Sequence, residues 1–214
     1  MSLGSGFYTS PVTDGYASDE IKALANLGVA VVCASGNSYD DTDNPNYEDE
    51  GVGYPSADIN ALSIGAVFHS SYGNAGGNIS GIDRIVNFSN RDDELTTIFA
   101  PGVHIPAAKN GGGVVYMSGT SMASPVVAGA VVIIQQVAEA LLGVRLTVSE
   151  LIDILKDYGD QIFDGDDEVD SVTNTNLWFP RLNIMNVAEA ILKTAGPAQY
   201  AVNLVGNTNL TELN

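Results

Sequence analysis

The chain has 214 residues, of which 45% are hydrophobic and 16% are charged, and its formal net charge at pH 7 is −18. This length predicts one domain that buries about 70% of the surface of its unfolded form. The large acidic excess argues against nucleic acid and anionic membranes as partners. A single cysteine, Cys33, excludes an internal disulfide. The longest apolar run, residues 126–134, is too short to span a bilayer, and no signal segment is recognisable at the N-terminus.

The first half of the chain alternates one helical pattern with several strand patterns. Residues 18–26 predict a helix because Asp19 and Glu20 stand in its first turn and Gly28 follows it. Runs rich in valine, isoleucine and alanine predict strands near residues 29–35, 61–67, 84–88 and 96–99. We expect Cys33 to be an apolar residue of the first of these strands. This alternation favours a layered α/β architecture.

The second half is dominated by helices. A glycine turn at residues 111–113 precedes a predicted strand at 114–117, and a long helix then runs from about Ser121 to Leu142, with Gly143 after it. Thr147 and Glu150 form a capping box that predicts a helix to about Tyr158. We expect residues 160–180 to form a polar insertion. Beyond residues 196–197 we expect an extended segment, either a linker or the start of a further domain.

The most informative stretch is residues 119–125, which read Gly-Thr-Ser-Met-Ala-Ser-Pro. Ser121 stands where a glycine turn runs into the long apolar helix, so free N–H groups at the helix start favour a developing oxyanion. Gly119 lets the backbone approach a substrate closely. The alternative is an ordinary helix start, because threonine and serine are common N-caps.

Chain order tests which class of nucleophilic serine this motif belongs to. An α/β-hydrolase needs a histidine after the serine, and both histidines, His69 and His104, precede Ser121. A chymotrypsin-like order would use His69 with Asp83, Asp92 or Asp93, but the residues around the serine do not suit that class.

A second motif follows an earlier strand pattern. Residues 31–37 read Val-Val-Cys-Ala-Ser-Gly-Asn, an apolar run that ends in a small-residue turn and Asn37. Ligand-binding groups of α/β sheets lie just beyond the carboxyl ends of the strands, which is where Asn37 is predicted to lie. The alternative is a turn asparagine that bonds local backbone groups.

Both motifs resemble those of the subtilisin-like serine proteases (subtilases), and so do stretches at residues 1–4, 52–55, 61–67, 87–90, 99–103, 181–183 and 187–190. Val126 departs from the histidine that many family members have. The resemblance implies a three-layer subtilisin-like fold, a mainly parallel sheet between helices. It implies Ser121 as nucleophile and Asn37 as the side-chain donor of the oxyanion hole. The substrate-binding residues it implies are Ser2, Leu3, Gly4, Ala34, Ser35, Gly36, Gly119 and Thr120.

The catalytic Asp and His of a subtilase do not fall within this sequence. Neither histidine has the family's His-Gly-Thr setting, and Asp14 in Thr-Asp-Gly predicts a surface turn. We therefore expect an N-terminally truncated peptidase domain over residues 1–196, which lacks those segments and is inactive alone. Its expected partners are an extended polypeptide substrate and the missing N-terminal segment. The family implies an extracellular or cell-surface location. A non-catalytic peptide-binding module is the alternative function.

Acidic side chains crowd two loops. The clusters are Asp40, Asp41, Asp43, Glu48, Asp49 and Glu50, and Asp164, Asp166, Asp167, Glu168 and Asp170. Neither has the spacing of an EF-hand, and solvated surface charge is the favoured interpretation. Calcium stays open as a cofactor because carboxylates are its ligands and subtilases often bind it in loops.

Overall fold

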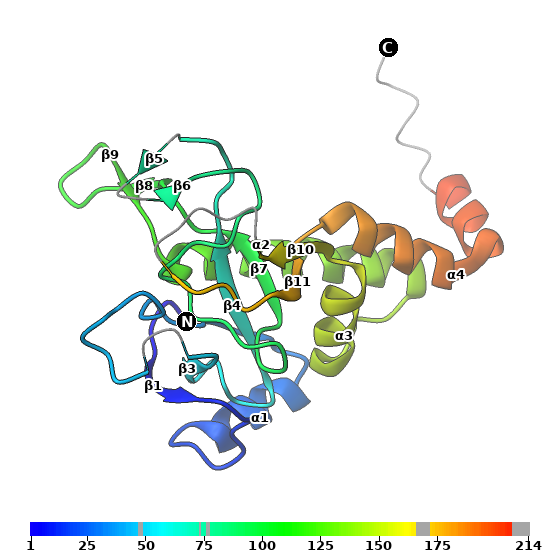
Figure 1. The fold of residues 1–214 in the computed structure, drawn as a ribbon. Coiled ribbons are helices and arrows are strands. Elements are labelled where there is room, and N and C mark those ends of the chain that lie inside the picture. The colour runs from blue at the N-terminus through cyan, green and yellow to red at the C-terminus, as the bar shows by residue number, and fades with distance from the viewer. Residues whose placement is uncertain (47–48, 73, 76–77, 166–171, 207–214) are drawn as a thin grey trace.

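A five-stranded sheet forms the centre of the computed structural model, which describes residues 1–46, 49–72, 74–75, 78–165 and 172–206 (Figure 1). Its strand order is β10-β11-β7-β4-β2. These strands are β2 (Val31–Ala34), β4 (Ala61–Val67), β7 (Ile98–Pro101), β10 (Asp160–Asp164) and β11 (Leu177–Arg181). Neighbours from β2 to β11 are parallel and β10 is antiparallel to β11, so the sheet is mainly parallel, as predicted.

Helices cover both faces of this sheet. They are α1 (Ser18–Asn26), α2 (Thr120–Leu142), α3 (Val148–Tyr158) and α4 (Ile184–Gly206). α2 packs against β2, β4 and β7 and carries α4 on its outer side. On the opposite face, Ile21 of α1 packs on Val31 and Cys33. The three-layer α/β prediction is confirmed, and β4 is buried along its whole length because both of its faces are covered.

Local signals position α2 and α3 as predicted. α2 ends at Gly143, which adopts a left-handed conformation (φ 74°) that favours glycine. At the start of α3, the Glu150 N–H donates to the Thr147 hydroxyl and the Thr147 N–H donates to the Glu150 carboxylate. By length and composition alone, α2 could cross a membrane, because the helix extends over 23 residues and not only over the apolar run at residues 126–134. Its Ala123, Val127 and Ile134 lie in the hydrophobic core, where α2 packs against β4 and β7.

Three sequence expectations are wrong. Residues 160–180 are not simply a polar insertion, because β10 and β11 form an antiparallel pair in which Ile162 lies opposite Phe179. The pattern near residues 84–88 gives a single bridge at Ile85 rather than a strand. Residues 197–206 are helical beyond a kink at Gly196 (φ 72°), where proline suits the first turn of a new helix.

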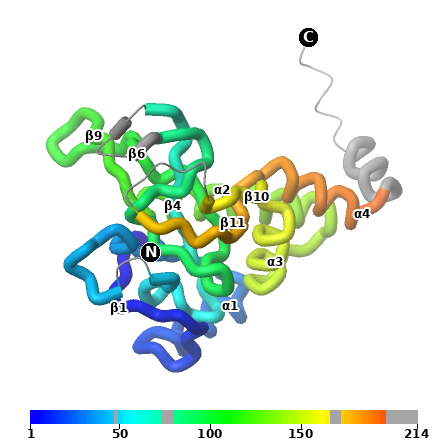
Figure 2. The backbone as a smooth tube through the Cα atoms, viewed as in Figure 1, coloured from blue at the N-terminus to red at the C-terminus, as the bar shows by residue number. Residues whose placement is uncertain are grey.

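The remaining strands form small pairs outside the central sheet. They are β1 (Ser5–Tyr8) with β3 (Val52–Tyr54), β5 (Asn74–Ala75) with β6 (Asn78–Ile79), and β8 (Ile105–Ala108) with β9 (Val114–Met117). The N-terminal segment lies beside the sheet (Figure 2): the Met1 amino group donates to Val32 O, and the Ala34 N–H donates to Met1 O at 3.0 Å. These contacts lead Ser2 towards the start of α2.

Candidate active site

Ser121 lies in the first turn of α2, where the N–H groups of a helix have no intrahelical acceptors. Gly119 precedes the helix with φ 152°, a conformation that strains any residue with a side chain. A Cβ at Gly119 would lie 3.4 Å from Asn37 Nδ2. Glycine therefore permits the turn, and a Cβ here would only reach van der Waals contact with the Asn37 amide.

Asn37 lies on the loop after β2, and a second segment holds this loop from behind. The Ser35 hydroxyl donates to Asn90 O at 2.8 Å, and the Asn90 N–H donates to Gly36 O at 3.0 Å. The Ser38 N–H donates to Asn90 Oδ1 at 2.7 Å. The position of Asn37 is thus determined by hydrogen bonds to Asn90 on both sides of it.

The side chain of Asn37 is oriented by Thr120. The Thr120 N–H and hydroxyl both donate to Asn37 Oδ1, at 2.8 and 2.9 Å. The two contacts identify this atom as the oxygen, because a backbone N–H can only donate. Asn37 Nδ2 makes no hydrogen bond with any residue that the structure describes. Its two N–H groups are available to a ligand.

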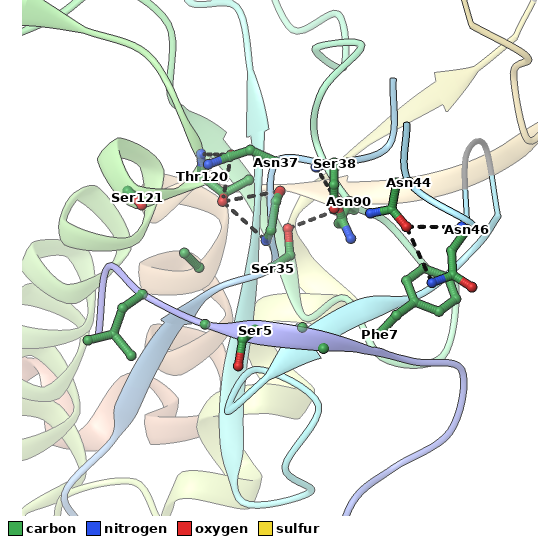
Figure 3. A pocket seen from close by; sticks show the side chains of 16 residues that line it. Ser5, Phe7, Ser35, Asn37, Ser38, Asn44, Asn46, Asn90, Thr120 and Ser121 are labelled. Atoms are coloured by element: carbon green, nitrogen blue, oxygen red, sulfur yellow. Dashed lines mark hydrogen bonds between the residues drawn. The ribbon is translucent and has the colours of Figure 1, made fainter. Parts of the chain in front are cut away.

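Ser121 and Asn37 line one pocket of about 420 Å³, shown in Figure 3. The edge of this pocket is formed by β1 and the residues before it, and its floor by the residues around the end of β2. The lining residues are Leu3, Gly4, Ser5, Gly6, Phe7, Ala34, Ser35, Gly36, Asn37, Ser38, Asn44, Asn46, Gly53, Asn90, Thr120 and Ser121.

Most of the predicted substrate-binding residues therefore gather here. Ser2 and Gly119 do not line the pocket but contact residues that do. Sequence reasoning missed eight of the lining residues: Ser5, Gly6, Phe7, Ser38, Asn44, Asn46, Gly53 and Asn90. Asn90 could have been found from the sequence, because it is the last residue of the stretch 87–90 that resembles the family. Nothing in the sequence around Asn44 and Asn46 indicated a site.

The hydroxyl of Ser121 donates to the carbonyl oxygen of Ser2 at 3.1 Å. The Ser2 hydroxyl in turn donates to Ser121 O at 2.8 Å. Neither histidine contacts Ser121 in the part of the chain that the structure describes. His69 pairs with Tyr72, and His104 stacks on Tyr116 with ring centroids 4.5 Å apart. The serine thus has no general base among the described residues.

A buried arginine, next to Asn90 in the chain, contacts the loop that follows Asn37. Arg91 is fully buried, and its guanidinium lies 3.7 Å from the centre of the Tyr39 ring. Arg91 Nε lies 2.9 Å from Asp164 Oδ2, and the Thr175 N–H and hydroxyl donate to the same carboxylate oxygen. Asp164 is therefore not the solvated surface charge that its acidic cluster suggested.

Two other carboxyl groups of this region have a pKa above the ordinary value. Burial raises the pKa of Asp40, whose carboxylate also accepts a bond from Asn87 Nδ2 at 2.6 Å. Burial, and then the charges of Asp93 and Asp92, raise the pKa of Glu50. Within the described ranges, no group of three or more His, Cys, Asp or Glu side chains could hold a metal ion. Glu48 and most of the second acidic cluster lie outside those ranges.

Comparison with known proteins identifies the family. The model of the Subtilase family matches residues 1–167. The chain is 36% identical over 130 residues to an intracellular serine protease of Paenibacillus polymyxa, an alignment that covers 61% of this chain and 34% of that protein. It is 33% identical over 140 residues to a subtilisin of Bacillus sp. (strain TA39), which covers 60% of this chain and 29% of the relative. The chain thus spans about a third of the length of these relatives.

Solved structures show the same fold. The prenylagaramide maturation protease PagA matches with a TM-score of 0.64 and 22% identity, over 89% of this chain and 60% of that one. The patellamide maturation protease PatA matches with a TM-score of 0.65 and 22% identity, over 89% and 61%. At this level of identity the two structures establish the α/β architecture of the chain and not its activity.

Proposed function

Because the chain belongs to the subtilase family of serine peptidases, we propose that it is the part of an endopeptidase that carries the nucleophile, Ser121, and the oxyanion donor, Asn37. The observation that carries this proposal is the orientation of Asn37. Its Oδ1 is occupied by Thr120, so its free Nδ2 faces the pocket that Ser121 also lines. Asn37 is exposed to this pocket, so both N–H groups of its amide are open to an oxyanion that forms beside Ser121.

In the proposed reaction, Ser121 Oγ attacks the carbonyl carbon of the scissile peptide bond and gives its proton to a histidine. Asn37 Nδ2 and the Ser121 N–H donate to the oxyanion that forms. The C–N bond then breaks as the histidine returns the proton to the leaving amine, and water hydrolyses the acyl ester to restore the serine. The carbonyl of Ser2, which holds the serine hydroxyl in this structure, cannot accept a proton at neutral pH.

We propose that the histidine and its aspartate belong to a segment outside residues 1–214, which docks beside β2. β2 is the edge strand of the central sheet as described, and Met1 hydrogen-bonds to Val32 and Ala34 on its outer side. Next to it lies a largely apolar groove of about 420 Å³ that extends to the start of α2. Its lining residues are Met1, Ser2, Leu24, Ala30, Val31, Val32, Ser124, Pro125 and Ala128. A segment in this groove would approach Ser121, since Ser2 and Ser124 hydrogen-bond to each other beside it.

The test is labelling by a serine-directed fluorophosphonate and cleavage of a casein substrate. Residues 1–214 alone should show neither, because an unassisted serine hydroxyl is a weak nucleophile. The protein extended upstream of Met1 as its gene encodes it should show both, and Ser121→Ala should lose both. Ser118→Ala, which removes an exposed hydroxyl from the same turn, is the matched control.

Two results would contradict parts of this proposal. If the extended protein binds peptides but neither cleaves them nor reacts with the probe, the chain is a peptide-binding module derived from a peptidase. If residues 1–214 alone cleave casein and His69→Ala or His104→Ala stops it, the base lies within the chain. An extracellular or cell-surface location remains part of the proposal, and fractionation of the producing cells tests it.

A further inference from the structure

The pocket beside Ser121 ends at an unusual group of amides. Asn44, Asn46 and Asn90 line it, and Figure 3 shows them together at the end away from Ser121. The Asn46 N–H donates to Asn44 Oδ1 at 3.0 Å, so the two loop asparagines lie against each other. No lining residue carries a formal charge on its side chain.

Asn90 has an unsatisfied donor at this end. The residue is only 3% exposed, and its Oδ1 accepts hydrogen bonds from the Ser38 N–H and hydroxyl. These contacts assign the other atom as Nδ2, for which no described residue is an acceptor. Nδ2 is not among the buried side-chain atoms that lack a partner, so this nitrogen is open to the pocket, where a ligand acceptor can reach it.

The backbone of Gly36 keeps this donor accessible. Gly36 has φ 125°, and a Cβ there would lie 2.9 Å from Asn90 Cγ and 3.0 Å from Nδ2. Any side chain at this position would therefore press on the Asn90 amide. Ser35 lies beside it with a hydroxyl that donates to Asn90 O, and whose oxygen can accept a further bond.

We propose, on the basis of the proposed peptidase function, that this pocket binds a substrate side chain that ends in a carboxamide, glutamine or asparagine, next to the cleaved bond. The carboxamide oxygen accepts from Asn90 Nδ2, and its NH₂ group donates to the neighbouring hydroxyl and amide oxygens. The specificity-determining residue is Asn90.

Other substrate side chains fit this pocket less well, because they lack an acceptor for Asn90 Nδ2 or carry a negative charge. Lysine and arginine have no acceptor for Asn90 Nδ2. An aromatic or aliphatic side chain would leave this donor buried and unpaired. A carboxylate could accept the bond, but it would enter a chain of net charge −18 beside a loop that carries Asp40, Asp41 and Asp43.

Two measurements test this proposal. In the first, isotope-labelled residues 1–214 are titrated with the peptides acetyl-Ala-Ala-Ala-X-amide, where X is Gln, Asn, Phe, Lys or Glu, and amide shifts of the pocket residues are followed. In the second, kcat/KM for cleavage after X is measured with the gene-encoded protein extended upstream. In both, Gln or Asn should exceed Phe, Lys and Glu by about tenfold or more, because sites built to hydrogen-bond a group reject analogues without it.

The sharpest variant is Asn90→Asp, which keeps the acceptor for Ser38 and replaces only the donor. It should lower the binding of the Gln and Asn peptides about tenfold and raise that of the Lys peptide, with a circular dichroism spectrum like that of the wild type. Asn26→Asp, on the exposed end of α1, makes the same charge change and should leave the order of peptides unchanged.

The outcomes separate this inference from the proposed function. A wild-type preference for Phe or Lys in the binding measurement overturns the inference even if Asn90→Asp fails to fold, and leaves peptidase activity standing. An extended protein that cleaves no peptide refutes the proposed function, and the binding measurement on residues 1–214 still decides the side chain that the pocket accepts.

Discussion

At the scale of single residues, the two ends of the Asn37 amide have different roles in the site. Asn37 uses Oδ1 to hold Thr120 and leaves Nδ2 free. The two halves of the amide therefore have separable effects: the oxygen maintains the turn before Ser121, and the nitrogen is proposed to stabilise the oxyanion. A substitution that changes only one half can distinguish a structural from a catalytic role.

Asn37→Asp keeps the acceptor for Thr120 and removes the donor. In the assembled protease we expect kcat to fall by at least about 10²–10³, the usual effect of losing one oxyanion-hole donor, with KM changed little. Steady-state kinetics on a peptide anilide measure it, with Asn26→Asp as the control for charge. A higher KM with unchanged kcat would show instead that Asn37 binds the substrate equally in the ground state and in the transition state.

Glu50 gives a prediction about pH. Its pKa is raised in the folded chain by burial and by neighbouring Asp93 and Asp92, so its ionised form disfavours the fold. The native state holds its proton to a higher pH than the unfolded state, and this contribution to stability is lost as pH rises through the folded pKa. Glu50→Gln should therefore raise Tm at pH 7, and the difference should vanish near pH 4. A scanning calorimetry series with Asp19→Asn, on the exposed side of α1, as the control would show whether any neutralised carboxylate has the same effect.

At the scale of elements, the loop after β2 is tied to the distant strand β10. Tyr39 stacks under Arg91, and Arg91 pairs with Asp164 at the end of β10. The pair is fully buried, at 0% and 1% exposure of the two side chains, so neither charge can be solvated if its partner is lost. This link couples the stability of the β10–β11 pair to the placement of the Asn37 loop.

Asp164→Ala should destabilise the fold by about 3–5 kcal/mol, because it leaves the Arg91 charge buried without a carboxylate. Urea unfolding measures the loss, and Asp93→Ala, an exposed acid near the same arginine, should cost far less. The double variant Arg91→Met with Asp164→Leu should recover much of it. Equal losses for the single and double variants would mean that the volume of the side chains, not the charge, is what matters.

At the scale of the whole molecule, exposed apolar side chains occur in and near the groove beside β2. Met1 and Leu24, which line the groove, are 48% and 38% exposed. Val132 and Ile133 follow Ala128 of the lining by about one helical turn and are 59% and 46% exposed. Apolar side chains exposed beside a sheet edge are typical of a surface that a partner covers. The proposed docking segment would cover it.

Residues 1–214 alone should therefore self-associate. Sedimentation velocity should show species larger than the 22.3 kDa monomer, and Val132→Lys combined with Ile133→Glu should shift the distribution towards the monomer. Lys22→Glu combined with Glu20→Lys, on exposed parts of α1, is the control pair. A monodisperse wild-type chain with one cooperative melting transition would contradict the idea that this surface awaits a partner.

The sequence by itself determined the family, the nucleophile motif and the elements with strong local signals. The Gly-Thr-Ser motif, the capping box at Thr147 and the buried β4 run depend on neighbouring residues along the chain, so local physics was enough to predict them. The β10–β11 pair was missed because its polar ends and short apolar core gave a weak alternating pattern, and its stability comes from pairing with β7. Only the tertiary structure brought Asn90 and Asn44 to the end of the pocket and Asp164 to Arg91. These residues are distant in the chain, so no local pattern predicts that they meet. By residue type alone, the asparagines indicate turns and Asp164 indicates a solvated charge.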